Sequence, residues 1–535
     1  MFLSVLLVGA GICLCFFPLV LSIDSVYGFL AYKGTLYTQS FNMIATVSSF
    51  NIGTIEKTFV SWWSPGQWML PAFLNYFTGI KTGIACIIIT IAANCAGLMG
   101  YYRLFRYFKF SPVVVSLSLL AILCSSTFYY SYFVYQGGEV LSFGIFPWFC
   151  LYTLRLQKVN AASALCIIAL FLLCFIAKST LILYCTLILM AKSIHLTYDK
   201  KSFFPGINKW QSIFFLAVSA CASITLIYFF YLSKGATPVS DKSKFFHLRI
   251  SDMLIPLSSP LQSILSVREW LTRADKIITI HYTQNPIAIY YTYIVSFVLA
   301  LITIFFGIAI RGSQSINSGY KVYLFFMYGG VSLFFFLSYA FNSQIGYDAR
   351  HYKLLGYLFI PAMLTILYNK VRTRYIHIIT LIFILLAVSD FIYLKNKWEA
   401  GRYVSTNYFY RHFDTLTNTD SLSEPAYKKL VALDNKIENK QHDSVIFFIE
   451  ADPDVALDLK HMAVLPPPGK NFLPGVYYGK GPELIICVSK KTLNLTKNAL
   501  KTKFPDYANF ELLDETDDYL FFSAKNQITF PNLPK

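Results

Sequence analysis

The chain has 535 residues, of which 56% are hydrophobic and 18% aromatic, and its mean hydropathy is +0.52. These values exclude a soluble protein of this length and indicate a membrane protein with several spans. The net charge of +17 does not indicate nucleic-acid binding, because most of the excess lies in short loops between apolar runs. Only one of the eleven cysteines, Cys487, lies in the polar C-terminal region, which excludes a disulfide framework there.

The apolar runs predict the helices. Residues 1–22 lack a basic leader and a small-residue cleavage site, so we expect a retained first helix rather than a cleaved signal peptide. Further runs of spanning length lie at 82–102, 111–131, 140–154, 161–177, 181–195, 211–232, 287–310, 321–341, 354–369 and 375–394. The sequence therefore predicts a polytopic α-helical membrane protein with about eleven transmembrane helices. Residues 178–180 alone separate two of the runs, which predicts either a tight hairpin or one broken element.

Basic residues in alternate loops predict the orientation. The basic loops carry Arg103, Arg106 and Lys109; Arg155 and Lys158; Lys192, Lys200, Lys201 and Lys209; Arg311 and Lys321; Lys370, Arg372 and Arg374. The positive-inside rule makes these loops cytoplasmic. The external side then holds an amphipathic loop at 23–81, the turn at 135–139, a loop at 233–286, the turn at 341–353 and everything after residue 394. The cytoplasmic loops have no phosphate-binding glycine-rich sequence, which argues against nucleotide chemistry on that side.

Two acidic residues lie at external helix ends. Asp24 directly follows the first apolar run, where a carboxylate is costly unless it is solvated or functional. It either marks the end of a helix or acts as a general base toward an acceptor hydroxyl. Glu139 ends the turn YQGGE, and it is either a polar loop tip or a second carboxylate that faces Asp24 across a cavity.

The sequence WWSPGQWMLP precedes the second run. Trp62, Trp63 and Trp68 are typical of membrane-interface anchors. Pro65 and Gly66 break a helix at the water boundary, which predicts an in-plane or re-entrant element.

The external turn GYDARHYK concentrates charge between two apolar runs. It contains Asp348, Arg350, His351 and Lys353. A local Asp–Arg pair with a snorkelling lysine is one reading. We favour a phosphate site, because a guanidinium is a fork of donors that fits phosphate and the turn is too short for so many incidental charges.

The C-terminal region, 395–535, is charged and predicts a small soluble α/β domain after a helical connector at 395–440. Strands are expected at 444–452, 483–490 and 517–525, a helix in LNLTKNALKTKF, and a helix start between Pro453 and Met462. No catalytic motif occurs in this region, so we expect it to be a cap or docking surface.

Together, these features resemble the C superfamily of polytopic glycosyltransferases (GT-C), which use polyprenyl-phosphate-linked sugars. The resemblance rests on Asp24 at the start of the first external loop, Glu139 in the next, the basic turn around Arg350 and the soluble α/β tail. It covers most of the membrane part as architecture. The chain departs from the family pattern in having one first-loop Asp rather than an acidic pair, and it lacks a WWDYG-like motif.

The resemblance implies a reaction and roles. A sugar would pass from a polyprenyl-phosphate donor to an acceptor hydroxyl of a glycan, lipid or protein on the extracytoplasmic face, with inversion. Asp24 would be the general base, and Arg350, His351 and Lys353 would bind the donor phosphate. Glu139, Glu56 and Asp348 would lie on the acceptor or metal side. No cofactor is certain, and a divalent metal, Mg²⁺ or Mn²⁺, stays open. The location implied is the bacterial inner membrane, in the pathway of cell-envelope glycans.

Two other classes stay open. A lipid-linked polysaccharide polymerase or ligase also has many spans and external basic residues. A lipid-glycan transporter or flippase would show internal repeats and charges at mid-membrane, and Lys178 is the residue that would favour it.

Overall fold

The structure is a computed structural model. It describes residues 2–22, 25–26, 29, 64–198, 209–234, 249–265, 286–341, 349–370, 373–399, 401, 405, 409–411, 422–437, 445–449, 455, 457–464, 483–493 and 499–527.

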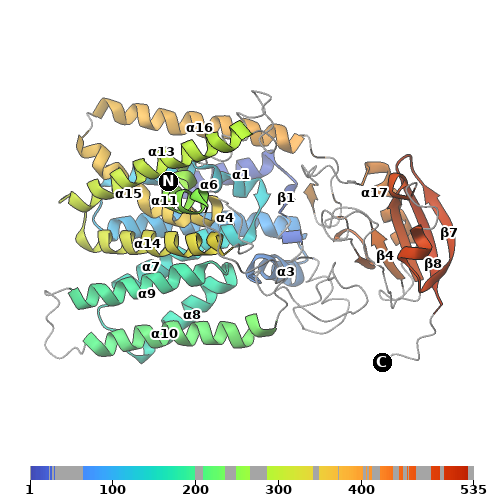
Figure 1. The fold of residues 1–535 in the computed structure, drawn as a ribbon, viewed down its shortest axis with the longest axis horizontal. Helices are drawn as coiled ribbons and strands as arrows, with labels where there is room; N and C mark the ends of the chain where they lie inside the picture. Colours follow the sequence, from blue (N-terminus) through green and yellow to red (C-terminus); the bar gives the residue numbers. More distant parts are fainter. Residues whose placement is uncertain are drawn as a thin grey trace.

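Helices, most of them long and apolar and four of them only three or four residues long, lie side by side in a bundle that fills one end of the molecule (Figure 1). They are α1 (Phe2–Cys15), α3 (Gly66–Thr78), α4 (Thr82–Tyr107), α5 (Pro112–Cys124), α6 (Ser126–Tyr129), η1 (Tyr130–Tyr132), α7 (Gly137–Arg155), α8 (Ala161–Ala177), α9 (Leu181–Tyr198), α10 (Lys209–Phe230), η2 (Leu232–Lys234), α11 (Ile250–Leu265), α13 (Pro286–Gly312), α14 (Ser318–Ala340), η3 (Ala349–Tyr352), α15 (Lys353–Lys370) and α16 (Thr373–Glu399).

Within the described ranges, four helices are long and apolar enough to cross a membrane. They are α4, α14, Trp210–Phe230 of α10 and Tyr293–Gly312 of α13, and a fifth span results if α5 and the segment after it, bent by 60°, count together. The mostly helical membrane fold is therefore confirmed, whereas the number of about eleven spans is not. Residues 178–180 form a tight turn between two separate helices, α8 and α9, which pack against each other.

The first apolar run is not one helix. α1 ends at Cys15, and the chain then forms a short strand, β1 (Leu19–Leu21). Pro18 separates the two because it lacks the N–H that a continuing helix needs. The prediction of a helix over residues 1–22 is therefore wrong beyond residue 15.

β1 is the middle strand of a three-stranded parallel sheet. One neighbour is β2 (Val134–Tyr135), which directly precedes α7, and the other is β3 (Tyr410–Arg411), which comes from the C-terminal region. Val20 is paired with Val134 on one side and with Arg411 on the other. This sheet joins three segments that are far apart in the sequence.

Part of the segment predicted as the long external loop 233–286 is helical. α11 packs against α13, α14 and α15, and its Asp252 is 1% exposed. The close approach to α15 occurs at Gly356, where a Cβ would lie 2.3 Å from Ser263 Oγ.

The C-terminal region contains a five-stranded sheet of order β5-β4-β6-β8-β7, at the other end of the molecule from the bundle (Figure 1). Its elements are α17 (Glu424–Lys436), β4 (Val445–Ile449), β5 (Met462–Val464), β6 (Glu483–Ser489), α18 (Lys490–Leu493), α19 (Ala499–Lys503), β7 (Tyr507–Glu515) and β8 (Tyr519–Asn526). β4 is parallel to β5 and β6, while β8 is antiparallel to β6 and β7. The three predicted strands correspond to β4, β6 and β8, whereas β5 and β7 were not predicted.

A buried carboxylate links this region to the three-stranded sheet. Asp458, 2% exposed, accepts hydrogen bonds from Ser405, from Tyr410 of β3 at 3.2 Å and from Tyr427 of α17 at 2.5 Å. Because Tyr410 is paired with Leu19, the C-terminal region is tied to β1, which directly precedes the segment that contains Asp24.

Candidate functional site

Glu139 is the centre of the charged cluster. It lies in the first turn of α7 and is only 7% exposed. Gly137 and Gly138 begin the helix, and the Glu139 backbone N–H donates to the Gln136 carbonyl at 2.8 Å. A carboxylate in the first turn of a helix is favoured by the helix dipole, but burial at this depth also demands cationic partners.

The first partner is Lys178. Its ammonium donates to Glu139 Oε1 from the turn between α8 and α9. The turn is ordered by two backbone hydrogen bonds, from Lys178 N–H to the Cys174 carbonyl at 2.9 Å and from Leu181 N–H to the Lys178 carbonyl at 3.0 Å. The turn therefore fixes the lysine against the end of α7.

The second partner is Lys353, the first residue of α15. Its Nζ lies 3.0 Å from Glu139 Oε2 and donates to the Glu139 backbone carbonyl at 2.8 Å. Lys353 is 4% exposed, so its charge is directed at Glu139. The two lysines that meet Glu139 here are 39 and 214 residues from it along the chain.

Arg350 and His351 precede Lys353 on η3, and both are close enough to act on the Glu139 carboxylate electrostatically. The His351 carbonyl accepts from Tyr184 of α9 at 2.8 Å, and its ring lies 5.8 Å from that of Phe335. Three basic side chains, those of Lys178, Lys353 and Arg350, therefore surround a single carboxylate. The N-termini of α7, α9 and α15 begin at the same place, so the local potential is positive and favours an anion.

The chain after β1 lies beside the same turn. Ser22 N–H donates to the Tyr135 carbonyl at 3.2 Å, and Ser25 Oγ donates to that carbonyl at 3.1 Å. Asp24 itself lies outside the described residues, but its neighbours on both sides are bonded to Tyr135, four residues before Glu139.

The helix α3 also reaches this turn. The Tyr135 hydroxyl donates to the Gln67 carbonyl at 2.5 Å, and a Cβ on Gly137 would lie 2.6 Å from Gln67 Cβ. Trp68 is 6% exposed and belongs to the apolar cluster that also contains Tyr410 and Tyr427. Its expected role as a membrane-interface anchor is therefore wrong, because the side chain packs inside the protein.

Several predicted residues lie outside the described part of the chain. They are Asp24, Glu56, Trp62, Trp63 and Asp348. Of the remaining predicted site residues, the structure brings Glu139, Arg350, His351 and Lys353 together. The cavity expected between Asp24, Glu139 and Arg350 includes undescribed chain and stays a prediction.

Lys178 was not among the predicted site residues. The sequence offers one signal for it, a lone charge in a three-residue connection between two very apolar runs, where a lysine is costly unless it is paired. Its partner could not be identified, because helix packing rather than spacing decides which turn meets which.

The described residues do not fit a divalent metal at Glu139. Its two oxygens face Lys178 and Lys353, and two ammonium groups at ion-pair distance repel a divalent cation. Among the residues that the structure describes, no group of three His, Cys, Asp or Glu side chains could hold a metal ion.

The chain matches no protein-family model and shows no significant similarity to a curated protein sequence. Among solved structures it is similar to the crystal structure of ArnT from Cupriavidus metallidurans bound to undecaprenyl phosphate, with a TM-score of 0.47, 10% identity and coverage of 99% of this chain and 98% of the other. The apo structure of the same protein matches with a TM-score of 0.44 and 11% identity over 98% and 97% of the two chains. These structural neighbours are glycosyltransferases of the GT-C class. With TM-scores below 0.5 and about one residue in ten identical, the matches leave the function of this chain to be inferred from its own residues.

Proposed function

We propose that the protein is a membrane glycosyltransferase. It transfers a sugar from a polyprenyl-phosphate donor to an acceptor hydroxyl on the extracytoplasmic face. The observation that carries this proposal is the convergence of Lys178, Lys353 and Arg350 on one buried carboxylate, where several apolar helices begin. A lipid-linked phosphate lies where membrane and water meet, and a positive site at that depth matches its charge.

We propose different roles for the basic residues and for Glu139. Lys353 is buried and contacts both the side chain and the carbonyl of Glu139, so we assign it to positioning. Arg350 is half-buried, and its guanidinium is suited to contact the donor phosphate and the charge that develops on it as the leaving group. Glu139 holds the two lysines and thereby keeps the phosphate site assembled.

The reaction is a single displacement. The acceptor oxygen attacks the anomeric carbon, the bond from that carbon to the phosphate oxygen breaks, and the configuration inverts. Asp24 takes the proton of the acceptor hydroxyl as general base. The hydrogen bonds from Ser22 and Ser25 to Tyr135 support this role, because they hold the chain around Asp24 next to the turn that carries Glu139.

The test is a transfer assay with the purified protein, radiolabelled polyprenyl-phosphate sugars and a membrane extract as acceptor. We expect transfer by the wild type to collapse in Asp24→Asn and in Arg350→Ala. Asp517→Asn and Arg106→Ala, which alter exposed residues away from the cluster, are the matched controls and keep wild-type rates. Transfer that survives Asp24→Asn removes Asp24 from the chemistry.

The other two classes give different results in the same experiment. A polymerase or ligase would move a preassembled glycan chain rather than a single sugar. A flippase would move the labelled lipid between leaflets of a vesicle without forming a new glycosidic bond.

A further inference from the structure

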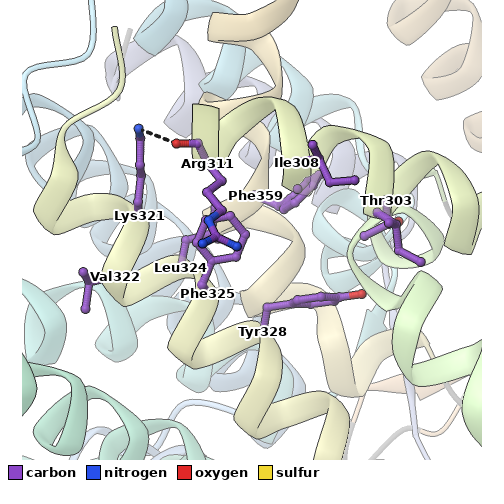
Figure 2. Close-up of a pocket in the computed structure, with 11 residues that line it drawn as sticks. Thr303, Ile308, Arg311, Lys321, Val322, Leu324, Phe325, Tyr328 and Phe359 are labelled. Atoms are coloured by element: carbon purple, nitrogen blue, oxygen red, sulfur yellow. Dashed lines mark hydrogen bonds between the residues drawn. The ribbon is translucent and has the colours of Figure 1, made fainter. Parts of the chain in front are cut away.

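An apolar groove lies between α13 and α14, and Phe359 of α15 forms part of its lining (Figure 2). Its volume is about 550 Å³. Ile304 and Ile308 on its rim are 43% and 69% exposed, so the groove opens to the surface that faces lipid. A methylene group needs about as much room as a water molecule, roughly 30 Å³, so the groove takes one acyl chain of ordinary length.

The groove is separate from the Glu139 cluster. Lys321 lines it near the start of α14, whereas Tyr339, at the other end of that helix, bonds through its hydroxyl to Tyr352 beside Lys353 at 2.8 Å. The eighteen residues between Lys321 and Tyr339 span about 27 Å of helix. The groove therefore lies in the opposite leaflet, which the basic loops predict to be cytoplasmic.

Two basic residues line this end of the groove, but they differ in how their charges are used. Lys321 Nζ donates to the backbone carbonyls of Arg311, at 3.0 Å, and Ser313. It thereby satisfies carbonyls at the C-terminal end of α13 that have no partner within the helix. In Figure 2 the Arg311 side chain instead extends toward Phe325.

Arg311 is exposed, and no acidic side chain in the described part of the chain forms an ion pair with its guanidinium. A guanidinium presents a planar fork of donors that fits a phosphate, and it stands here at the end of a groove sized for one hydrocarbon chain. Basic pockets between helices on the cytoplasmic side are typical sites for anionic lipid headgroups.

We propose that this groove binds one anionic glycerophospholipid, with one acyl chain between α13 and α14 and the phosphate on Arg311. The occupant is a membrane phospholipid rather than the polyprenyl donor, because a long polyprenyl chain exceeds the volume of the groove. The site is independent of the transferase activity proposed above.

Two variants test the charge of Arg311 and the shape of the groove separately. Arg311→Gln removes the phosphate contact and leaves the groove. Gly307→Leu fills the groove and leaves the charge, and the backbone accepts the substitution because the nearest atom to a Cβ at Gly307 is Phe325 Cε1 at 3.8 Å, an ordinary contact distance. The matched controls are Arg106→Gln, an exposed arginine on α4, and Gly329→Leu, at a glycine of α14 that is not among the residues lining the groove and where a Cβ meets nothing within 4 Å.

The measurement is native mass spectrometry of the purified full chain titrated with phosphatidylglycerol or phosphatidylcholine. We expect the wild type and both controls to bind phosphatidylglycerol about fivefold more tightly than phosphatidylcholine. This ratio corresponds to the free energy of one basic contact at a membrane surface. Arg311→Gln should bind both lipids equally, and Gly307→Leu should weaken both. Equal binding of the two lipids by the wild type, or two groove variants that match their controls, would overturn the proposal.

Discussion

Lys353 donates a hydrogen bond to the backbone carbonyl of Glu139 at 2.8 Å, and its Nζ lies 3.0 Å from the carboxylate of the same residue. One ammonium thus holds both the main chain and the side chain at the start of α7. Because Lys353 is the first residue of α15, this contact fixes the two helix starts relative to each other, and with them the Arg350 turn.

We expect Lys353→Met to lower the stability of the protein by roughly 1–3 kcal/mol, the value of a hydrogen bond to a charged group. The measurement is thermal unfolding of the purified protein in detergent. Lys428→Met, which alters an exposed lysine on α17, is the control and should change little. If Lys353→Met were as stable as this control, the contacts of Lys353 with Glu139 would contribute nothing to the stability of the protein.

Glu139 should be more sensitive than either of its lysines. Glu139→Gln leaves the buried ammonium of Lys353 and the half-buried ammonium of Lys178 without their carboxylate, which costs about 3–5 kcal/mol. We expect the double variant Glu139→Gln/Lys178→Met to be less damaged than the sum of the two single variants, because it removes one of the stranded charges. Additive losses in the same unfolding experiment would mean that the two residues do not interact.

If Arg350 contacts the donor phosphate, transfer should depend on the planar shape of its guanidinium and not only on its charge. Arg350→Lys keeps the charge and loses the planar fork, so we expect transfer to fall strongly while thermal stability stays near that of the wild type. Measuring KM for the donor and kcat separately shows whether the loss of activity lies in donor binding or in the transfer step. Full activity in the lysine variant would reduce the role of Arg350 to bulk charge.

The two glycines of the YQGGE turn differ in how much space they have. An alanine at position 137 would place its Cβ 2.6 Å from Gln67 Cβ and 2.8 Å from Gln67 Cα, whereas at position 138 the nearest atom is 3.5 Å away. We expect Gly137→Ala to destabilise the protein by roughly 1–3 kcal/mol and to reduce transfer, because α3 has to move away from the start of α7. Gly138→Ala is its control and should behave like the wild type; equal effects of the two substitutions would contradict this account.

Asp458 joins the C-terminal sheet to β3 through Tyr410 and Tyr427. Asp458→Asn should weaken this connection, because only one of the two polar atoms of an amide accepts hydrogen bonds, whereas both carboxylate oxygens of Asp458 do. We expect faster proteolysis between the bundle and residue 424, measured by limited digestion. Lys428→Met serves again as the surface control, and identical digestion patterns would count against this connection.

The long apolar helices could be predicted from the sequence because each apolar run is long enough to be recognised by itself, whereas α11 lies in a segment that was predicted to be a loop. The end of α1 was missed because Pro18 lies inside a run that is apolar throughout. A hydropathy pattern does not show that proline lacks a backbone N–H. The strands β4, β6 and β8 were found from short apolar runs, whereas β7 alternates exposed polar and apolar residues at the edge of its sheet and gives a weaker signal.

The candidate site was predictable only in part. Arg350, His351 and Glu139 stand out because charges are rare between apolar runs, and the cost of burying them makes a partner necessary. The pairing of Glu139 with Lys178 depends on how α7, α8 and α9 pack, which no local pattern encodes. The same holds for β3, a strand of two residues whose pairing with β1 is visible only in the folded chain.

The pairing of β1 with β3 also bears on the order in which the protein is made. Val20 is paired with Arg411, about 390 residues later in the chain. At a synthesis rate of roughly 5–20 residues per second, β1 waits about 20–80 s for its second neighbour after it leaves the ribosome. During that time the membrane helices can insert and pack. β1 therefore gains its second neighbour only after the chain has been made as far as residue 411, when the helices of the bundle have had time to pack.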